Sequence, residues 1–435
     1  MSETVRRNAT LDDAIAEARA RYVAANPASL ARHVESLAVM PGGNTRTVLH
    51  VDPFPLAMAA GEGGVLRDAD GHAYLDFLGE YTAGLFGHAN PVIRAAIDRA
   101  LDGGISLGAA NLVEARFARA VCDRFGLERV RFTNSGTEAN LMALATACAV
   151  TGRRGVLAFR GGYHGGLLAF GAASPTNAPY DVVLAPYNDL DATQAAIAAE
   201  AGRLAAIILE PMQGGGGCIP AEPAFLAGLR DAADAAGALL ILDEVMTSRL
   251  APGGLQSVLG VRPDLTTLGK YVGGGMSFGA FGGGAAVMDR FDPRRPDAFA
   301  HAGTFNNNVL TMSAGLAGLT EVFTPEACAA LGARGEALRA RLNDRARAHG
   351  AQMQFTGIGS MMTVHFAAGP IRRVEDVAGA DPRLKELFFF DLLASGIWLA
   401  RRGMMNLSLP TDDAACAALE AAVEEFLCSH AAFLQ

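Results

Sequence analysis

Long apolar segments are missing from this sequence. No segment runs 18 apolar residues without a charge, and the first residues, MSETVRRNATLDDA, hold no apolar stretch of signal-peptide length. The sequence therefore predicts neither a membrane span nor a secretory signal, and it favours a cytoplasmic protein.

Basic residues are in the minority. Lys plus Arg number 36 against 45 Asp plus Glu, which gives a formal net charge of −9. Proteins that wrap a nucleic-acid backbone carry the opposite sign, because phosphates attract Lys and Arg. Nucleic acid is therefore not an expected partner.

Metal-binding spacings and repeats are also missing. The six cysteines are scattered, with no C-x-x-C and no Cys/His spacing that suits zinc, so buried free thiols are expected. The chain has no internal repeat or low-complexity tract. With 435 residues, 51% of them hydrophobic, it is long enough for two or three domains with a large core.

Short apolar runs alternate with helical stretches from about residue 90 to 325. The runs are RVRF from 129, GVLAF from 155, LAAIIL from 204 and ALLIL from 238. Apolar strands separated by helices predict a mostly parallel sheet that is covered on both faces. Ligands bind at the carboxyl ends of the strands in such sheets, so the loops after these runs are the candidate sites.

The two ends of the chain have other patterns. Helical spacing over 11–38 is followed by a hairpin pattern over 65–77 that turns at Asp70-Gly71. After about 325 come a long charged helix, strand-like residues 353–366, a helix near 384–394 and an edge strand after Gly396. We therefore predict an α/β protein with a large domain over 76–325 and a smaller α+β domain over 326–435. The segment 1–75 is expected to join the smaller domain.

The loop after the run at 129 reads TNSGTEAN. Ser135 and Glu138 fit a capping box at a helix N-terminus. The amides beside Gly136 and the hydroxyls of Ser135 and Thr137 would make a good phosphate seat there. By itself the pattern also describes an ordinary capped helix.

The run at 238 ends in Asp243-Glu244-Val245. An ionised carboxylate at the end of a buried strand is costly unless it meets a cation, so a buried positive partner is implied. A metal ion is the rival partner, but no histidine cluster or further carboxylate pattern lies nearby.

Residues 264–275 read DLTTLGKYVGGG, with Lys270 among glycines. The spacing is not that of a P-loop, and no hydroxyl follows the lysine. A lysine with flexible, apolar neighbours can be desolvated, which lowers its pKa and makes its amine nucleophilic, as Schiff-base chemistry requires. A surface lysine in a turn is the ordinary alternative.

The three motifs together describe one ligand with a phosphate, a basic ring nitrogen and a carbonyl. Pyridoxal phosphate has all three. A nicotinamide dehydrogenase is a weaker alternative, because no G-x-G-x-x-G follows an early strand. A protein that binds the cofactor without catalysis fits poorly with the intact Lys270 and Asp243.

Seven segments resemble the class III aminotransferases of PLP fold type I over nearly the whole chain. They are NSGTEA at 134, GYHG at 162, EP at 210, LDEVMT at 242, LGKYVGGG at 268, GAFGG at 279 and HAGTF at 301. The resemblance implies a homodimer with shared active sites, because Thr304 in this family reaches the cofactor phosphate of the neighbouring subunit. It also implies roles for single residues: Lys270 as the catalytic lysine that binds the cofactor, Asp243 at the ring nitrogen, Val245 and Tyr163 on the ring faces, and Ser135, Gly136 and Thr137 at the phosphate.

Two departures from the family pattern narrow the range of expected substrates. Met246 stands where many members have a glutamine, and Gly215 stands where many have a glutamate that parks a substrate-gating arginine. The glutamate-1-semialdehyde aminomutases and the β-amino acid aminotransferases share both departures. The sequence is thus less similar to ornithine and GABA transaminases.

Two arginines resemble carboxylate-binding residues of this branch. PGGNTR at 41 offers Arg46 for the substrate carboxylate, and IWLARRGMMNLSLP at 397 offers Arg402 for the α-carboxylate of the amino acceptor, with Arg401 as the alternative. Tyr81, in GEYTAGLFGH, is a candidate for the substrate pocket or for packing.

The expected reaction passes the amino group of a 3-aryl- or 3-alkyl-3-aminopropanoate to a 2-oxo acid such as 2-oxoglutarate or pyruvate. An aminomutase uses one substrate as donor and acceptor and would not need the second arginine. Glutamate-1-semialdehyde 2,1-aminomutase, or another class III ω-aminotransferase, is the alternative.

Overall fold

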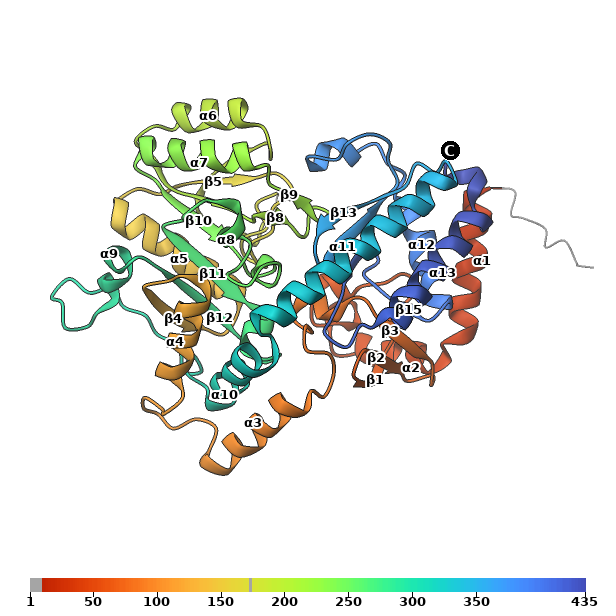
Figure 1. Cartoon of the computed structure of the whole chain (residues 1–435), viewed down its shortest axis with the longest axis horizontal. Coiled ribbons are helices and arrows are strands. Elements are labelled where there is room, and N and C mark those ends of the chain that lie inside the picture. Colours follow the sequence, from red (N-terminus) through yellow and green to blue (C-terminus); the bar gives the residue numbers. More distant parts are fainter. Residues whose placement is uncertain (1–9, 172–173) are drawn as a thin grey trace, which may run out of the picture.

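The computed structural model describes residues 10–171 and 174–435 (Figure 1). Within these ranges no helix is both long enough and apolar enough to cross a membrane. Two groups of elements lie side by side in Figure 1, and the helix α11 (Pro325–Ala348) runs between them.

The predicted sheet has seven strands in the order β4-β12-β11-β10-β7-β5-β6. The neighbours from β11 to β6 pair in parallel, whereas β12 is antiparallel to both β11 and β4. The mostly parallel sheet is therefore confirmed. Its strands are β4 (Arg129–Thr133), β5 (Gly155–Phe159), β6 (Asp181–Ala185), β7 (Leu204–Leu209), β10 (Leu239–Asp243), β11 (Leu265–Gly269) and β12 (Gly279–Gly283).

Both faces of this sheet are buried, which explains the continuous apolar runs. On one face Ile207 and Leu240 belong to a cluster with residues of α7 (Pro223–Ala236). On the other face Ala206 and Ile241 belong to a cluster with residues of α5 (Gly136–Thr151). Alternate residues of one strand thus pack on opposite layers of helices, and every position along the strand is apolar.

A smaller sheet joins the two ends of the chain. Its order is β1-β2-β3-β15, and β15 (Ile397–Trp398) lies at its edge, parallel to β3. The hairpin of β2 (Val65–Asp68) and β3 (Ala73–Asp76), which follows β1 (Met58–Glu62), turns where the sequence predicts it. This shared sheet supports our proposal that the segment 1–75 belongs with the C-terminal domain.

Helices and a third sheet complete the C-terminal side. The helix α1 (Leu11–Ala25) packs against α12 (Pro382–Ala394), and α12 in turn contacts α13 (Asp413–Ser429). The third sheet consists of β13 (Gln354–Ile358), β14 (Met361–His365) and β16 (Met404–Asn406). The strand-like pattern over 353–366 thus forms two strands, which reverse at Gly359, where φ is +53°.

One helical segment and two cysteines differ from what the sequence pattern predicts. The helical spacing over 11–38 forms two helices, and α2 (Pro27–Leu37) starts anew because Pro27 supplies no backbone donor and disfavours helix at Asn26. The expected buried thiols are found for four cysteines, whereas Cys148 is half-buried and Cys428 exposed.

Candidate active site

Three of the predicted loops meet at the carboxyl ends of the strands. Val245, after β10, lies against two glycines from neighbouring loops. A Cβ on Gly136 would lie 2.8 Å from Val245 Cγ1, and a Cβ on Gly269 would lie 3.2 Å from the same atom. The glycines therefore allow the backbones of β11 and α5 to approach the loop after β10.

The N-terminus of α5 differs in detail from the predicted capping box. Ser135 Oγ accepts a hydrogen bond from the amide of Glu138 at 3.1 Å, as expected. The Glu138 carboxylate, however, accepts from the amide of Asn134 at 2.9 Å, not from that of Ser135. The predicted reciprocal bond is wrong by one residue, because the Glu138 side chain reaches past the cap. Thr137 packs against Gly165: a Cβ on Gly165 would lie 2.2 Å from the hydroxyl oxygen of Thr137.

Asp243 is 3% exposed and is surrounded by hydrogen-bond donors. Its Oδ2 accepts from His164 Nδ1 and Asn140 Nδ2, both at 2.8 Å, and its Oδ1 accepts from the amide of Val245 at 3.0 Å. These donors orient the carboxylate at the end of β10. Both His164 and Asn140 stand in motifs singled out in the sequence, GYHG and TNSGTEAN, but the sequence analysis assigned neither of them a role.

Glu210 connects the Tyr163 loop to this buried group. Its carboxylate accepts from the amides of Tyr163 and Gly214, each at 2.9 Å. Burial raises the pKa of Glu210 to about 7, while His164 lowers and Asp243 raises it. The Tyr163 side chain itself is 52% exposed and available to a ligand.

Glu244 faces the other way from Asp243. It accepts hydrogen bonds from the Thr247 hydroxyl and the Gln256 amide, and burial raises its pKa to about 7. The sequence implied a cation near these acids, but the donors on Glu244 are neutral. A carboxyl that is half protonated near neutral pH needs no positive partner.

Lys270 follows β11 in a left-handed conformation, with φ of +55°. This conformation is unfavourable for a residue with a Cβ and tends to occur at functional sites. Burial lowers the pKa of Lys270 to about 8, and the negative charge of Asp243 partly opposes the shift. The amine is thus far more nucleophilic at neutral pH than an ordinary lysine.

This pKa predicts how the protein takes up an aldehyde. Only the neutral amine condenses with a carbonyl, so the rate of cofactor uptake by the apoprotein should rise with pH up to about 8 and then level off. Rapid-mixing absorbance measurements across the pH range would follow the uptake. A rate that keeps rising toward the ordinary lysine value of 10.5 would contradict the lowered pKa.

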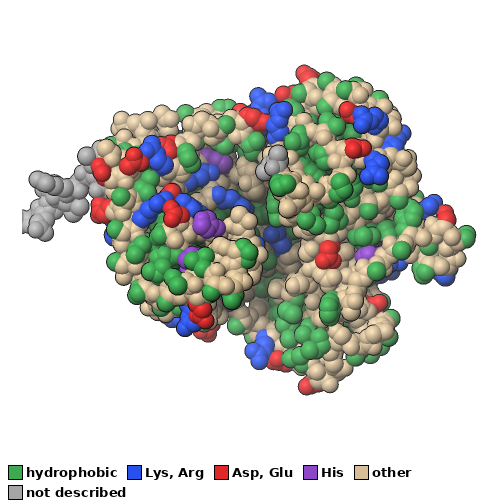
Figure 2. Space-filling view, turned by 180° about the vertical axis from the view of Figure 1, so that it is seen from behind, with side chains coloured by type: hydrophobic (Ala, Val, Ile, Leu, Met, Phe, Trp, Pro, Cys, Tyr) green, Lys and Arg blue, Asp and Glu red, His purple; other side chains and the backbone are tan. Residues whose placement is uncertain are grey.

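Arg46 and Arg402 approach the same aromatic ring. The Cζ atoms lie 5.8 Å (Arg46) and 5.2 Å (Arg402) from the centroid of Tyr81. Both charges lower the pKa of Lys270, which places them in electrostatic range of its amine. Figure 2 shows the molecule hollowed between its two lobes, with basic side chains (Lys or Arg, blue) inside the hollow.

The two neighbouring arginines at 401 and 402 have different surroundings. Arg401 forms an ion pair with Glu386 at 3.1 Å. Within the described residues Arg402 has no carboxylate partner: its Nη2 donates to Met404 Sδ at 3.3 Å, and its buried Nε has no acceptor. Arg402 is therefore the arginine that is left to bind an anion.

Three further predicted residues lie around these loops. A Cβ on Gly215 would lie 3.3 Å from Tyr163 Cβ, and Met246 Sδ would lie 2.6 Å from a Cβ on Gly214. Thr304 is exposed in a loop that lies beside the start of α5, since Asn134 Nδ2 donates to Asn306 Oδ1 at 3.0 Å.

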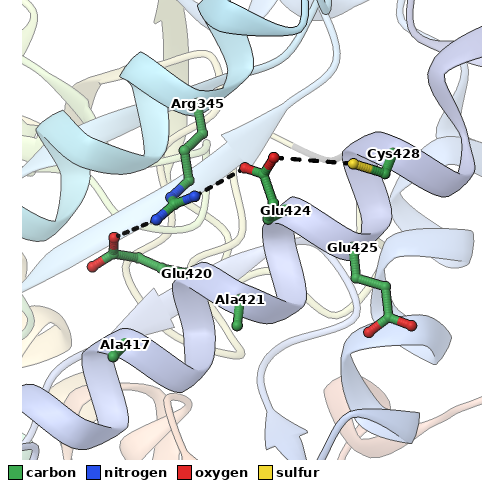
Figure 3. Close-up of a pocket in the computed structure, with 7 residues that line it drawn as sticks. All are labelled: Arg345, Ala417, Glu420, Ala421, Glu424, Glu425 and Cys428. Atoms are coloured by element: carbon green, nitrogen blue, oxygen red, sulfur yellow. Dashed lines mark hydrogen bonds and ion pairs between the residues drawn. The ribbon is translucent and has the colours of Figure 1, made fainter.

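A separate group of ionisable side chains lies on α11 and α13 (Figure 3). There a cavity of about 430 Å³ is lined by Arg345, Glu420, Glu424 and Cys428, and Arg345 bridges the two glutamates. Among residues 10–171 and 174–435, His349, Glu424 and Cys428 form the one group that could hold a metal ion. This group is not at the strand ends.

The strand-end residues fit pyridoxal phosphate. The glycine-containing start of α5 suits the phosphate, the buried and oriented Asp243 suits the ring nitrogen, and the low-pKa amine of Lys270 suits the aldehyde.

Comparison with known families decides the assignment. The sequence model of the family "Aminotransferase class-III" matches residues 48–411 of this chain. The chain belongs to the class III aminotransferases. Like other members of the family, this aminotransferase uses pyridoxal phosphate and acts on amino acid and oxo acid substrates.

Individual relatives are similar over nearly the full length of this aminotransferase. A beta-phenylalanine transaminase of Variovorax paradoxus is 55% identical over 98% of this chain and 99% of its own. The crystal structure of a beta-phenylalanine aminotransferase from that organism superimposes with a TM-score of 0.96, at the same coverage of both chains. A glutamate-1-semialdehyde 2,1-aminomutase of Sorangium cellulosum is 40% identical over 86% of this chain and 89% of its own.

Proposed function

We propose that this aminotransferase moves the amino group of a 3-aryl- or 3-alkyl-3-aminopropanoate to a 2-oxo acid such as 2-oxoglutarate or pyruvate. The observation that carries the proposal is the placement of Arg46 and Arg402 at one aromatic ring, Tyr81, within electrostatic range of Lys270. The similarity to a beta-phenylalanine transaminase supports the same substrate class.

Two separate arginines suit this pair of substrates. In a β-amino acid the carboxylate is one carbon further from the amine-bearing carbon than it is in an α-amino acid. The donor and the 2-oxo acid therefore need cations at different places around the same reacting carbon. Arg46 would hold the donor carboxylate and Arg402 the α-carboxylate of the acceptor, each through the planar fork of its guanidinium group.

The chain's own groups then divide the work. Bound pyridoxal phosphate supplies an electron sink for the charge that develops on the substrate carbon. Lys270 Nζ takes the proton from the amine-bearing carbon, and its lowered pKa suits it to act as a base near neutral pH. Asp243, held by His164 and Asn140, would present a fixed negative charge to the ring nitrogen.

The remaining residues would position the cofactor. Val245 and Tyr163 would lie on the two faces of its ring, and Ser135, Gly136 and Thr137 would bind its phosphate. The exposed Thr304 would reach the cofactor phosphate of a partner subunit in a homodimer. Sedimentation at micromolar concentration tests the dimer, and a monomer with full activity would contradict it.

A screen of single half-reactions tests the substrate class. The cofactor-loaded enzyme is mixed with α-, β- and γ-amino acids, and loss of the cofactor's absorbance band is followed. We expect 3-amino-3-phenylpropanoate to convert the cofactor faster than α-alanine or 4-aminobutanoate. Conversion by α- or γ-amino acids alone would rule out the proposal.

The same proposal predicts a selective effect of Arg402→Ala. Removing a cation that binds a buried carboxylate costs about 2–5 kcal/mol. The acceptor half-reaction with 2-oxoglutarate should therefore lose much of its kcat/KM, while the donor half-reaction changes little. Arg401→Ala is the matched control, because Arg401 is already paired with Glu386. Equal losses for donor and acceptor would contradict two separate carboxylate sites.

An aminomutase is the second candidate, because such enzymes are also among the relatives. Incubation of the enzyme in its amine-loaded form with glutamate-1-semialdehyde distinguishes the two. Formation of 5-aminolevulinate without turnover of β-amino acids would favour the aminomutase.

A further inference from the structure

The turn that carries Tyr81 has an unusual backbone. Glu80, Tyr81 and Thr82 have φ values of +47°, +53° and +82°. Three successive residues with side chains in the left-handed region are unfavourable, because each Cβ crowds the following carbonyl oxygen. Such segments persist where the surrounding structure holds them, and they cluster at ligand sites.

The turn is held firmly at both sides. Asp76 Oδ1 accepts from the amides of Leu78 and Gly79, each at 2.9 Å. Asn406 Nδ2 donates to the carbonyl of Leu78 at 2.9 Å, and Thr82 is fully buried. The surroundings thus fix a strained backbone that directs the Glu80 and Tyr81 side chains toward Arg46.

Arg46 already has a carboxylate partner on this turn. It forms an ion pair with Glu80 while its guanidinium lies over the ring of Tyr81. The two side chains are about half exposed, at 48% for Arg46 and 56% for Glu80. Arg46 itself lies in extended backbone between two short turns, so its side chain is not locked in a helix.

From this contact we infer that Glu80 is an internal counter-ion, which holds Arg46 until the carboxylate of the amino donor displaces it. With a 2-oxo acid on Arg402, Arg46 stays on Glu80. This inference rests on the proposed role of Arg46 in donor binding, and it makes Glu80 a specificity-determining residue.

The charges near Lys270 explain why such a counter-ion is useful. Arg46 and Arg402 lower the pKa of Lys270, whereas Glu80 and Asp243 raise it. Without Glu80, an unpaired Arg46 would add its full charge beside Arg402 whenever no donor is bound. A half-exposed ion pair stabilises its two residues only weakly, so a substrate carboxylate of the same chemistry can exchange with it readily.

In many class III aminotransferases a glutamate at another position pairs with a substrate-binding arginine, but that position cannot supply a counter-ion here. Gly215 stands at that place and offers no carboxylate. The partner of Arg46 comes instead from the strained turn, on a different segment of the chain.

Glu80→Gln tests the inference by removing the charge and keeping the shape. The affinity for 3-phenylpropanoate, an unreactive carboxylate without the amine, should rise about 2- to 5-fold, since an exposed ion pair no longer competes for Arg46. The donor half-reaction should show the same fall in its apparent dissociation constant. The half-reaction with pyruvate should stay within about 2-fold. Glu80→Asn is the second variant, because asparagine tolerates left-handed backbone better than most residues.

Controls separate the two proposals. Glu222→Gln removes another exposed glutamate–arginine pair, with Arg372, and should leave all constants unchanged. In an Arg46→Ala background the effect of Glu80→Gln should vanish. Unchanged or weaker carboxylate binding in both Glu80 variants, with the fold intact by circular dichroism, would overturn the inference. A wild-type enzyme that converts no β-amino acid would instead overturn the proposed function.

Discussion

Replacing Lys270 by alanine should abolish transamination and the cofactor's absorbance band near ~420 nm, which depends on its bond to an amine. We expect turnover to fall by about 10⁴-fold or more, because the variant would lose both of the roles proposed for Lys270, covalent attachment and base, and proton transfer alone contributes roughly 10²- to 10⁴-fold. Lys270 combines a lowered pKa, a left-handed backbone conformation and an electrostatic interaction with Asp243. These features support its assignment as the reactive lysine.

The composition of the chain gives this experiment a built-in control. Lys270 and Lys385 are its only lysines. Borohydride reduction of the loaded enzyme, followed by peptide mass analysis, should place the cofactor on Lys270. Burial also lowers the pKa of Lys385 to about 8, so nucleophilicity alone does not select between the two amines. Cofactor attached to Lys385, or full turnover by Lys270→Ala, would contradict the assignment.

A Lys385→Met variant sharpens the comparison. It keeps an unbranched apolar side chain that is one atom shorter and removes the amine. The absorbance band should persist in this variant and disappear only in Lys270→Ala. The distinction rests on position, because only Lys270 lies at the end of β11 within range of the Asp243 charge.

The strands of the central sheet were predictable where burial on both faces makes every position apolar. The strand β12 did not have this pattern, because its sequence, GAFGG, is mostly glycine and glycine is depleted in strands. Close approach explains the glycines: a Cβ on Gly279 would lie 2.0 Å from the carbonyl oxygen of Ser135, and one on Gly283 would lie 2.1 Å from that of Asp264. Such contacts between distant segments leave no local periodicity.

The candidate site was likewise predictable only in part. Lys270, Asp243 and the start of α5 stand in motifs whose chemistry can be read along the chain. His164 and Asn140 also stand in such motifs, but their contact with Asp243 could not be predicted, since they are 79 and 103 residues away from it. The pairing of Arg46 with Glu80 likewise spans 34 residues and depends on a strained turn that side-chain patterns do not indicate.

Asp243→Asn is expected to have the second largest effect. Removing one partner of a buried charge pair costs about 3–5 kcal/mol, which corresponds to a roughly 10²- to 10⁴-fold loss of kcat. Both carboxylate oxygens accept from donors: Oδ2 from His164 and Asn140, and Oδ1 from the Val245 amide. In either orientation the new amide nitrogen therefore faces another donor, and the ring nitrogen of the cofactor would lose the fixed negative charge that we propose for Asp243.

The adjacent residue provides a matched control for this variant. Glu244 is as deeply buried as Asp243, at the same strand end, but its pKa is raised to about 7 and its partners are neutral. Glu244→Gln should keep kcat within about tenfold, because burial shifts the Glu244 carboxyl toward its neutral form, which resembles an amide, and the Thr247 hydroxyl can turn to accept from the new amide. Equal losses in the two variants would mean that the strand end acts only as a buried scaffold. A loss confined to Asp243→Asn, with cofactor still attached to Lys270 after borohydride reduction, would place the effect in the chemical step, where the charge at the ring nitrogen acts.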